Sequence, residues 1–221
     1  MNASSMDPPG SRVKPRRYDA SRRRADAART RSRMLDTAER MLLADGYAGT
    51  TVAAIAAAAG VSSELIYKSF GGKAGLVRAI QQRGLLGDGP VGAPDRSDAL
   101  SATDLDARSL LREWSVLSTE VAPRTAPIMV LVRAAAANDA DLADLIEEMA
   151  EQRLQRMALN AERLTAHAGV RRDLTVEQIR DILWTYTSPE LFDLLVDRRG
   201  WTVDGYRDYL FRGLCGQLLQ P

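Results

Sequence analysis

An all-α fold is predicted by three properties of this 221-residue chain. Hydrophobic residues make up 45% of it, which is enough for a packed core. Its many Ala, Leu, Arg and Glu residues favour helix over strand along the whole sequence. Apolar residues also recur at helical spacing, and no segment shows a convincing strand pattern.

Several classes of protein are disfavoured by the composition. No apolar run approaches the roughly 18 residues that span a bilayer, and no apolar segment follows the basic N-terminus as in a secretory signal. One cysteine, Cys215, and one histidine, His167, leave no intramolecular disulfide and no ordinary zinc site. A catalytic triad would depend on His167 alone, and no glycine-rich phosphate loop follows a strand. We therefore expect a cytoplasmic protein without membrane attachment, catalytic activity, metal or cofactor.

Basic residues are concentrated at the N-terminus, although the net charge of the chain is only +1. Residues 1–33 hold ten basic and three acidic residues, a local charge of +7 that leaves −6 for the remainder. Residues 1–22 are expected to form a disordered basic arm; Arg22 at its end, and Arg23 and Arg24 directly after it, are candidate contacts to a polyanion. Such an arm is either a solubilising tail or a contact to a polyanion at one end of the molecule.

Four helices are predicted in the first 86 residues. The first begins near Asp26 and ends at Gly46; its apolar face consists of Met34, Leu35, Ala38, Met41 and Leu42. The second is capped by Thr50 or Thr51 and ends at Gly60. The third is capped by Ser62, and the fourth runs from about Lys73 to Leu86.

A glycine- and proline-rich stretch, residues 87–99, is predicted to be a linker or loop. Beyond it we expect helices at about 103–120, 124–137, 139–168, 175–187, 189–199 and 202–219. The breaks near 188 and 200 are the best defined, because Ser188 caps a helix with Pro189 at its first position, and Gly200 precedes the cap Thr202.

The second and third helices meet the steric demands of a helix-turn-helix. Ala56 offers a small side chain where the helices cross, and Gly60 can take the positive φ of a tight turn. Val61 and Ile66 have the spacing of a hydrophobic staple around the cap at Ser62.

The third helix has two faces when about 100° is allowed per residue. Leu65, Ile66, Ser69 and Phe70 are predicted to face the core, and Ser63, Glu64, Tyr67 and Lys68 to face outward. Ser63 and Glu64 would meet base edges in a major groove, and Tyr67 and Lys68 would meet phosphates. Alternatively, Glu64 and Lys68 form only a solvated i, i+4 ion pair.

The stretch "AGTTVAAIAAAAGVSSELIYKSFGGKAGLVRAI" resembles the N-terminal domain of TetR-type bacterial transcriptional regulators. This resemblance implies a homodimer that places the third helix of each subunit in one half of a palindromic operator in double-stranded DNA. It implies DNA contacts by Thr50 or Thr51, Ser62, Ser63, Glu64, Tyr67, Lys68 and Lys73. The segment "GGKAG" departs from the family pattern, and Gly71 and Gly72 are expected to loosen the joint before the fourth helix.

The resemblance further implies that the C-terminal half binds a small, often hydrophobic effector and forms the dimer. Candidate pocket residues are Trp114, Met129, Arg133, Met149, Met157, Trp184 and Tyr186. Candidate dimer residues are Leu191, Phe192, Leu195, Trp201, Tyr206, Leu210 and Leu214. Each of these residues is alternatively plain core; the last helix carries an apolar stripe from Val203 to Leu218 that fits either role.

These observations divide the chain into three parts: an arm (1–22), a helix-turn-helix domain (23–72) and an effector-binding and dimerisation domain (73–221) that starts with the fourth helix. The predicted function is a sequence-specific transcriptional regulator, a repressor that its effector releases from DNA. The alternative is an architectural protein that binds DNA without sequence choice and has no effector.

Overall fold

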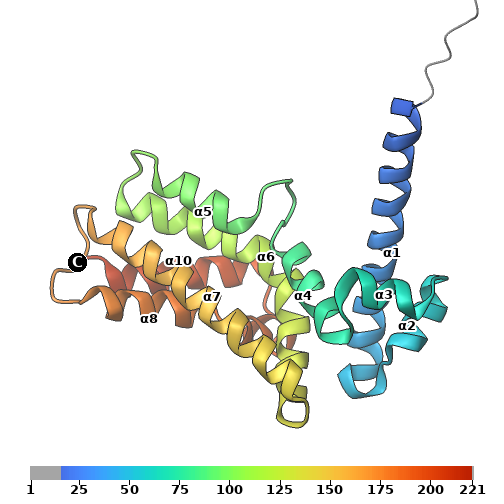
Figure 1. The fold of residues 1–221 in the computed structure, drawn as a ribbon. Helices are drawn as coiled ribbons and strands as arrows, with labels where there is room; N and C mark the ends of the chain where they lie inside the picture. The colour runs from blue at the N-terminus through green and yellow to red at the C-terminus, as the bar shows by residue number, and fades with distance from the viewer. Residues whose placement is uncertain (1–15, 221) are drawn as a thin grey trace, which may run out of the picture.

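The computed structural model describes residues 16–220, with side chains from residue 21 onward, so the predicted arm up to residue 15 lies outside the described part. The N-terminal unit contains α1 (Arg16–Gly49), α2 (Val52–Ala59), α3 (Ser63–Phe70) and α4 (Lys73–Gly84). The start of α1 projects beyond this unit (Figure 1). Helix α1 begins at Arg16 and not near Asp26, so residues 16–22, predicted to be disordered, are helical.

The larger unit lies beside the first, with α4 at the junction (Figure 1). Its elements are α5 (Ala93–Ser101), α6 (Ala107–Ala135), the short 3₁₀ helix η1 (Ala136–Asn138), α7 (Ala140–Thr165), α8 (Val176–Tyr186), α9 (Pro189–Phe192), the π-helical turn η2 (Asp193–Asp197) and α10 (Val203–Leu218). The described residues contain no helix long and apolar enough to cross a membrane.

Two predictions for this unit were wrong. The segment predicted as a linker contains α5, whose first turn is favoured by Pro94 and whose Ala93 and Ser97 are buried. The two helices predicted at 103–120 and 124–137 are one helix, α6, which continues through Pro123 and Pro127. Buried apolar side chains on both sides of the prolines hold α6 in one piece against its neighbours. The predicted caps at Ser188 and Thr202 are confirmed.

One hydrophobic cluster joins the two units. It contains Ile55 and Ile66 of the helix-turn-helix, Leu76 and Ile80 of α4, and Ile128 of α6. A second cluster fills the space between α6, α7, α8 and α10, and a third, small one lies between α6, α9 and α10. Since the first cluster is continuous, a displacement of α6 or α7 is transmitted to α4 by direct packing.

Three glycines form the α3–α4 junction. Gly71 ends α3 with φ of 79°, and Gly72 has φ of 130°, a conformation that side chains other than glycine rarely adopt. At Gly75 a Cβ atom would overlap the carbonyl oxygen of Phe70. Gly71 and Gly72 therefore supply the positive φ values of the turn, and Gly75 lets the start of α4 lie directly against the end of α3, so the joint expected to be loose is closely packed at Gly75.

The variant Gly75→Ala is expected to lower the free energy of unfolding by about 1–3 kcal/mol, because α3 and α4 must move apart to admit the methyl group. The control is Gly216→Ala, on α10, where a Cβ meets nothing within 4 Å. Thermal denaturation at fixed protein concentration measures both variants. Equal melting temperatures for Gly75→Ala and the unsubstituted protein would contradict the prediction.

Candidate nucleic-acid interface and internal cavity

The helix-turn-helix is fixed by local hydrogen bonds. Thr51 caps α2, with its hydroxyl oxygen accepting from Ala54 N at 3.1 Å, and Ser62 caps α3 by accepting from Leu65 N at 3.2 Å. Gly60 has φ of 65° in the turn between the two helices. Val61 and Ile66 both pack into the first hydrophobic cluster, as the staple spacing predicts.

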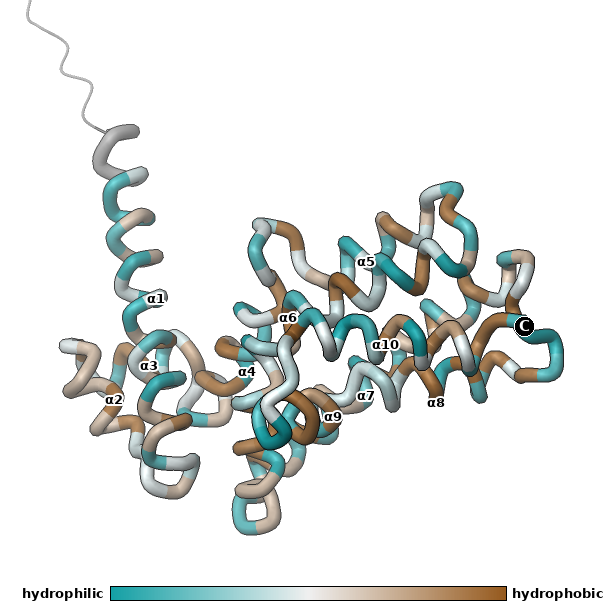
Figure 2. Tube along the Cα trace, turned by 180° about the vertical axis from the view of Figure 1, so that it is seen from behind, coloured by the Kyte–Doolittle hydropathy of each residue, from teal (hydrophilic) through white to brown (hydrophobic). Residues whose placement is uncertain are grey.

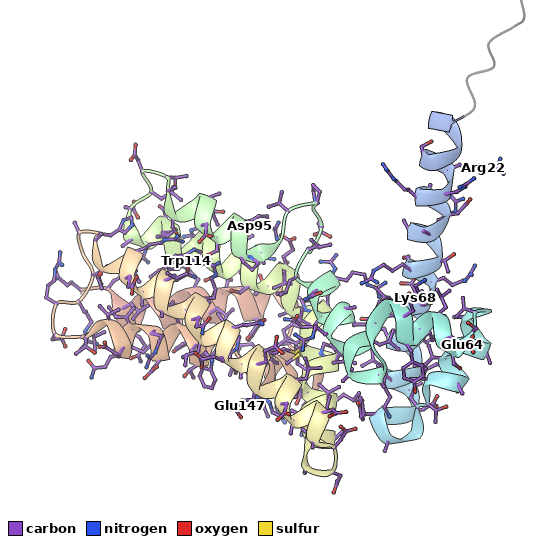
Figure 3. The ribbon with its side chains drawn as sticks, in the orientation of Figure 1. Arg22, Glu64, Lys68, Asp95, Trp114 and Glu147 are labelled. Atoms are coloured by element: carbon purple, nitrogen blue, oxygen red, sulfur yellow. The ribbon has the colours of Figure 1, made fainter. Side chains whose placement is uncertain are left out.

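The outward face of α3 carries the predicted polar side chains. Tyr67 is 56% exposed, Glu64 and Lys68 are exposed, and Ser63 is half-buried. Glu64 and Lys68 lie along the same helix at the end of the molecule that α1 also occupies (Figure 3). One prediction for this helix was wrong: Leu65 is 36% exposed, because it lies at the margin of the buried face that is centred on Ile66.

Thr50 was predicted, as an alternative to Thr51, to lie at DNA, but it does not face outward. It is only 1% exposed, and its hydroxyl donates to the carbonyl oxygens of Gly46 at 2.8 Å and Met41 at 3.2 Å. These carbonyls lie at the kink in α1, where Gly46 with φ of 75° leaves the helical conformation. Thr50 therefore closes the end of α1, and its neighbour Thr51 is the exposed residue of the pair.

Lys73 points into the domain and not toward solvent. Its ammonium donates to the carbonyl oxygens of Tyr47 at 2.7 Å and Thr50 at 2.9 Å, and lies 3.9 Å from the centre of the Tyr47 ring. Burial lowers the pKa of Lys73, and the nearby carboxylate of Asp139 partly offsets this effect. The first residue of α4 thereby ties that helix to the α1–α2 loop.

Helix α1 carries the basic residues past the end of α3. Arg31 donates to Ser69 O at 3.3 Å, and its guanidinium lies 4.3 Å from the centre of the Phe70 ring. At about 100° per residue, Arg24 lies within about 20° of Arg31 around α1, whereas Arg22 lies on the opposite side. Hydrophilic turns predominate in the projecting part of α1, which holds Arg22 (Figures 2 and 3).

A cavity of about 260 Å³ lies between the end of α4 and helices α5, α6, α7, α8 and α10 of the larger unit. Six of the seven predicted pocket residues line it: Trp114, Met129, Arg133, Met149, Met157 and Tyr186. Trp184 does not line the cavity, but Arg153, which does, stacks on its indole with the guanidinium carbon 4.3 Å from the ring centre.

Arg153 is the main residue of the cavity that the sequence analysis missed. It donates to Trp184 O and to Thr187 Oγ1, the second at 3.2 Å. Burial, reinforced by the nearby Arg133, lowers the pKa of Arg153 to about 10. A signal was present in the sequence, since Arg153 lies between Met149 and Met157 at four-residue spacing, in the middle of an apolar helix face.

A chain of polar contacts leads from the cavity to α4. Gln152 lines the cavity and donates to Glu148 Oε1 at 3.0 Å. Glu148 accepts two hydrogen bonds from Arg78 of α4, one of them 2.7 Å long. The bond from Arg78 is the main cause that lowers the pKa of Glu148. Arg83, one turn further along α4, pairs with Asp36 and Glu39 of α1.

Four predicted dimer residues are buried inside the protomer. They are Phe192, Tyr206, Leu210 and Leu214, each at most 3% exposed. A Cβ at Gly213 would overlap the ring of Tyr186 in the same chain. The stripe on α10 is therefore intramolecular core. Leu191 and Leu195 are half-buried, and Trp201 is 41% exposed.

Comparison with known proteins agrees with this architecture. Residues 34–80 match the sequence model of bacterial regulatory proteins of the tetR family. No curated protein matches the chain. A TetR-family regulator from Rhodococcus sp. superposes with a TM-score of 0.64 and 19% identity, over 87% of this chain and 100% of that one.

Two further crystal structures contain a bound small molecule. A transcriptional regulator from Saccharomonospora viridis in complex with choline has a TM-score of 0.63 and 21% identity, over 88% of this chain and 100% of that one. The SmeT–triclosan complex has a TM-score of 0.67 and 20% identity, over 86% and 92%. The predicted resemblance is confirmed: residues 34–80 match the helix-turn-helix region of the tetR family, and 87% of the chain shares the fold of a TetR-family transcriptional regulator.

The variant Lys73→Met is expected to lower the free energy of unfolding by about 1–3 kcal/mol, because it removes the charged donor of Thr50 O and leaves Tyr47 O with only the long bond from Thr50 N at 3.4 Å. Lys68→Met, on the outward face of α3, is expected to change it by less than about 0.5 kcal/mol. Thermal or urea denaturation without DNA measures both. If Lys73→Met were as stable as Lys68→Met, its ammonium would not be holding the loop.

Proposed function

We propose that this protein is a sequence-specific DNA-binding transcriptional regulator, a repressor that binds a palindromic operator as a homodimer and is released by a small, largely hydrophobic effector. The proposal is carried by one observation: a helix-turn-helix with a polar, exposed recognition face is joined through α4 to an apolar cavity. An architectural protein without an effector has no use for such a cavity. Action on DNA also implies a cytoplasmic location.

In this proposal α3 enters the major groove, with Ser63 and Glu64 at its N-terminal end reading base edges. Tyr67 and Lys68 contact phosphates, as does Thr51 at the start of α2. Ser62 is engaged as the α3 cap, so it contributes to DNA binding by holding α3. Thr50 and Lys73 are not contacts in this proposal, because both side chains are engaged inside the domain.

The helical start of α1 adds phosphate contacts beside α3. Arg24 is the best-placed arginine, since it shares the face of α1 on which Arg31 meets the end of α3. Arg22 faces away, and Arg23 lies between the two. These contacts supply affinity that depends on salt and little on sequence.

The effector acts by shifting the population between two positions of α4. A molecule in the cavity contacts α7 at Gln152 and α4 directly at Gln81 and Leu85. Movement of α7 passes to α4 through the Glu148–Arg78 pair and through the shared hydrophobic cluster. Since α3 abuts α4 at Gly75, the spacing of the two recognition helices changes, and the dimer no longer fits successive major grooves.

For the homodimer we propose the surface around α9, η2 and the start of α10. Leu194 and Trp201 are 50% and 41% exposed there, and Leu191 and Leu195 lie half-buried beside them. This surface replaces the α10 stripe, which the protomer itself buries.

Selection of bound DNA from a random pool tests the function. A single enriched palindrome, with half-site centres about one helical turn (34–36 Å) or a multiple of it apart, is the expected result. Recovery of DNA without any enriched sequence, together with unbroken protection in footprinting, would instead establish architectural binding.

The variant Arg24→Ala is expected to weaken operator binding and to reduce the slope of log K against log salt by about 1, as loss of one phosphate contact does. Arg22→Ala is the matched control, two residues away on the opposite side of α1, and should leave the slope unchanged. Fluorescence anisotropy of labelled operator at four or more salt concentrations measures both. Equal slopes for the two variants would refute the placement of Arg24.

The variant Arg78→Gln is expected to weaken the coupling between ligand binding in the cavity and operator binding. Small apolar compounds that stabilise the protein in a thermal-shift screen should bind this variant as they bind the unsubstituted protein. In the unsubstituted protein these compounds should weaken operator binding. In Arg78→Gln, the factor by which they weaken it should be at least about fivefold smaller. Arg171→Gln, which removes a surface pair with Asp173, is the control. Unchanged release from DNA in Arg78→Gln would rule out this route of coupling.

A further inference from the structure

Three arginines line the cavity, and no Asp or Glu is among the described residues around it. Arg133 pairs with Glu190 and Arg156 pairs with Asp98, so two of the three charges have a carboxylate partner outside the cavity wall. Arg153 has no ion pair with any carboxylate of the described chain; its oxygen partners are Trp184 O and Thr187 Oγ1, both uncharged. Asp98 is also shared with Arg163, so the surroundings of the cavity are net positive, and Arg153 is the arginine of the wall that has no carboxylate partner.

Two residues that line the cavity also carry hydrogen-bond donors that have no acceptor among the described residues. The second terminal nitrogen of Arg153, Nη2, is shielded from solvent and has no acceptor among the described residues. The indole Nε1 of Trp114, which also lines the cavity, is a second donor without an acceptor. Neither group can accept a hydrogen bond. Both donors belong to residues that line the cavity, so a ligand that reaches either of them must bring acceptor atoms.

A guanidinium buried without a counter-charge is costly to the free protein. Burial lowers the pKa of Arg153, yet at about 10 it leaves the side chain protonated at neutral pH. Charge-assisted hydrogen bonds from arginine to a carboxylate are among the strongest that proteins make. An anion bound beside Arg153 would therefore offset the cost of burying its charge.

The remainder of the wall is mostly apolar, including Met129, Met149, Met157, Leu183 and Leu210. The volume of about 260 Å³ is just below the roughly 300–1,000 Å³ of pockets that hold drug-sized ligands, so it suits a small molecule of about ten non-hydrogen atoms. The ligand that matches this wall has a single acidic group and a flexible or flat apolar body of modest length.

We propose that the effector is an amphipathic monocarboxylate of about ten non-hydrogen atoms, whose carboxylate is bound by Arg153 and whose apolar body lies against the methionines of α6 and α7. This inference adds the chemical class of the effector to the proposed function. Binding of such a molecule is independent of DNA, so the two are tested separately.

The first test compares three probes of matched chain length by calorimetry with the full-length protein and no DNA: octanoate, octanamide and octyltrimethylammonium. Octanoate is expected to bind at least about tenfold more tightly than octanamide, as a charged hydrogen bond predicts. The cationic probe is expected to give no binding. Equal or tighter binding of octanamide or of the cation, or no binding of octanoate, would overturn the proposal.

The second test removes the charge from the wall. Arg153→Gln is expected to weaken octanoate binding by about tenfold to a hundredfold and to leave octanamide within about twofold. Arg180→Gln, on the surface of α8 beside Asp181, removes the same charge away from the cavity and should change neither probe. Unchanged octanoate affinity in Arg153→Gln would overturn the assignment. If that variant does not fold, Arg153→Lys replaces it, with an expected loss for octanoate alone.

Adding octanoate to the operator complex separates the ligand class from the regulatory function. Release of DNA by octanoate, reduced in Arg153→Gln, supports both. Calorimetric binding that requires Arg153 but leaves the DNA complex intact supports the ligand class and refutes release by this effector. DNA release by the amide and the cation, without release by octanoate, supports ligand-controlled binding and overturns the carboxylate.

Discussion

Helix α4 is held at its first residue by Lys73, whose ammonium donates to the carbonyl oxygens of Tyr47, in the last turn of α1, and Thr50, in the loop that follows. Along its length, Arg83 binds the carboxylates of α1 and Arg78 binds the carboxylate of Glu148 on α7. These contacts seat α4 between the recognition domain and the cavity. Because Gly75 lets α3 approach without a gap, the position of α3 follows that of α4. The position of the α3 recognition face and the wall of the cavity both depend on these contacts of α4.

The cavity shows how a functional site departs from the rules for a stable core. Elsewhere in the described chain, the half-buried Arg156 and Arg163 share the carboxylate of Asp98. Asp98 shows the effect of this pairing, since the bond from Arg163 is the main cause that lowers its pKa. Arg153 has only neutral partners and the face of Trp184. Under the proposed function, a ligand supplies the charged partner that Arg153 lacks, and its binding is thereby linked to the arrangement of α7 and α8.

Most of the recognition domain could be predicted from the sequence, because its determinants are local. Caps at Thr51 and Ser62, the turn at Gly60 and the staple of Val61 with Ile66 all involve residues within five positions of one another. The pocket candidates were found because methionine and aromatic residues on amphipathic helices are few in this chain. The α10 stripe could not be assigned in the same way, since an apolar face has the same pattern whether its partner is another helix of the chain or a second subunit.

The sequence by itself determined an all-α fold, the helix-turn-helix and the outward face of α3 with Tyr67 and Lys68, since helical periodicity and capping act over a few residues. Only the tertiary structure decided that Lys73 points inward, that the glycines at the joint pack α4 tightly against α3, and that Arg153 faces an apolar cavity without a counter-charge. These properties depend on which carbonyls, helices and carboxylates become neighbours. Such neighbours lie tens of residues apart in the chain, and no local pattern specifies them.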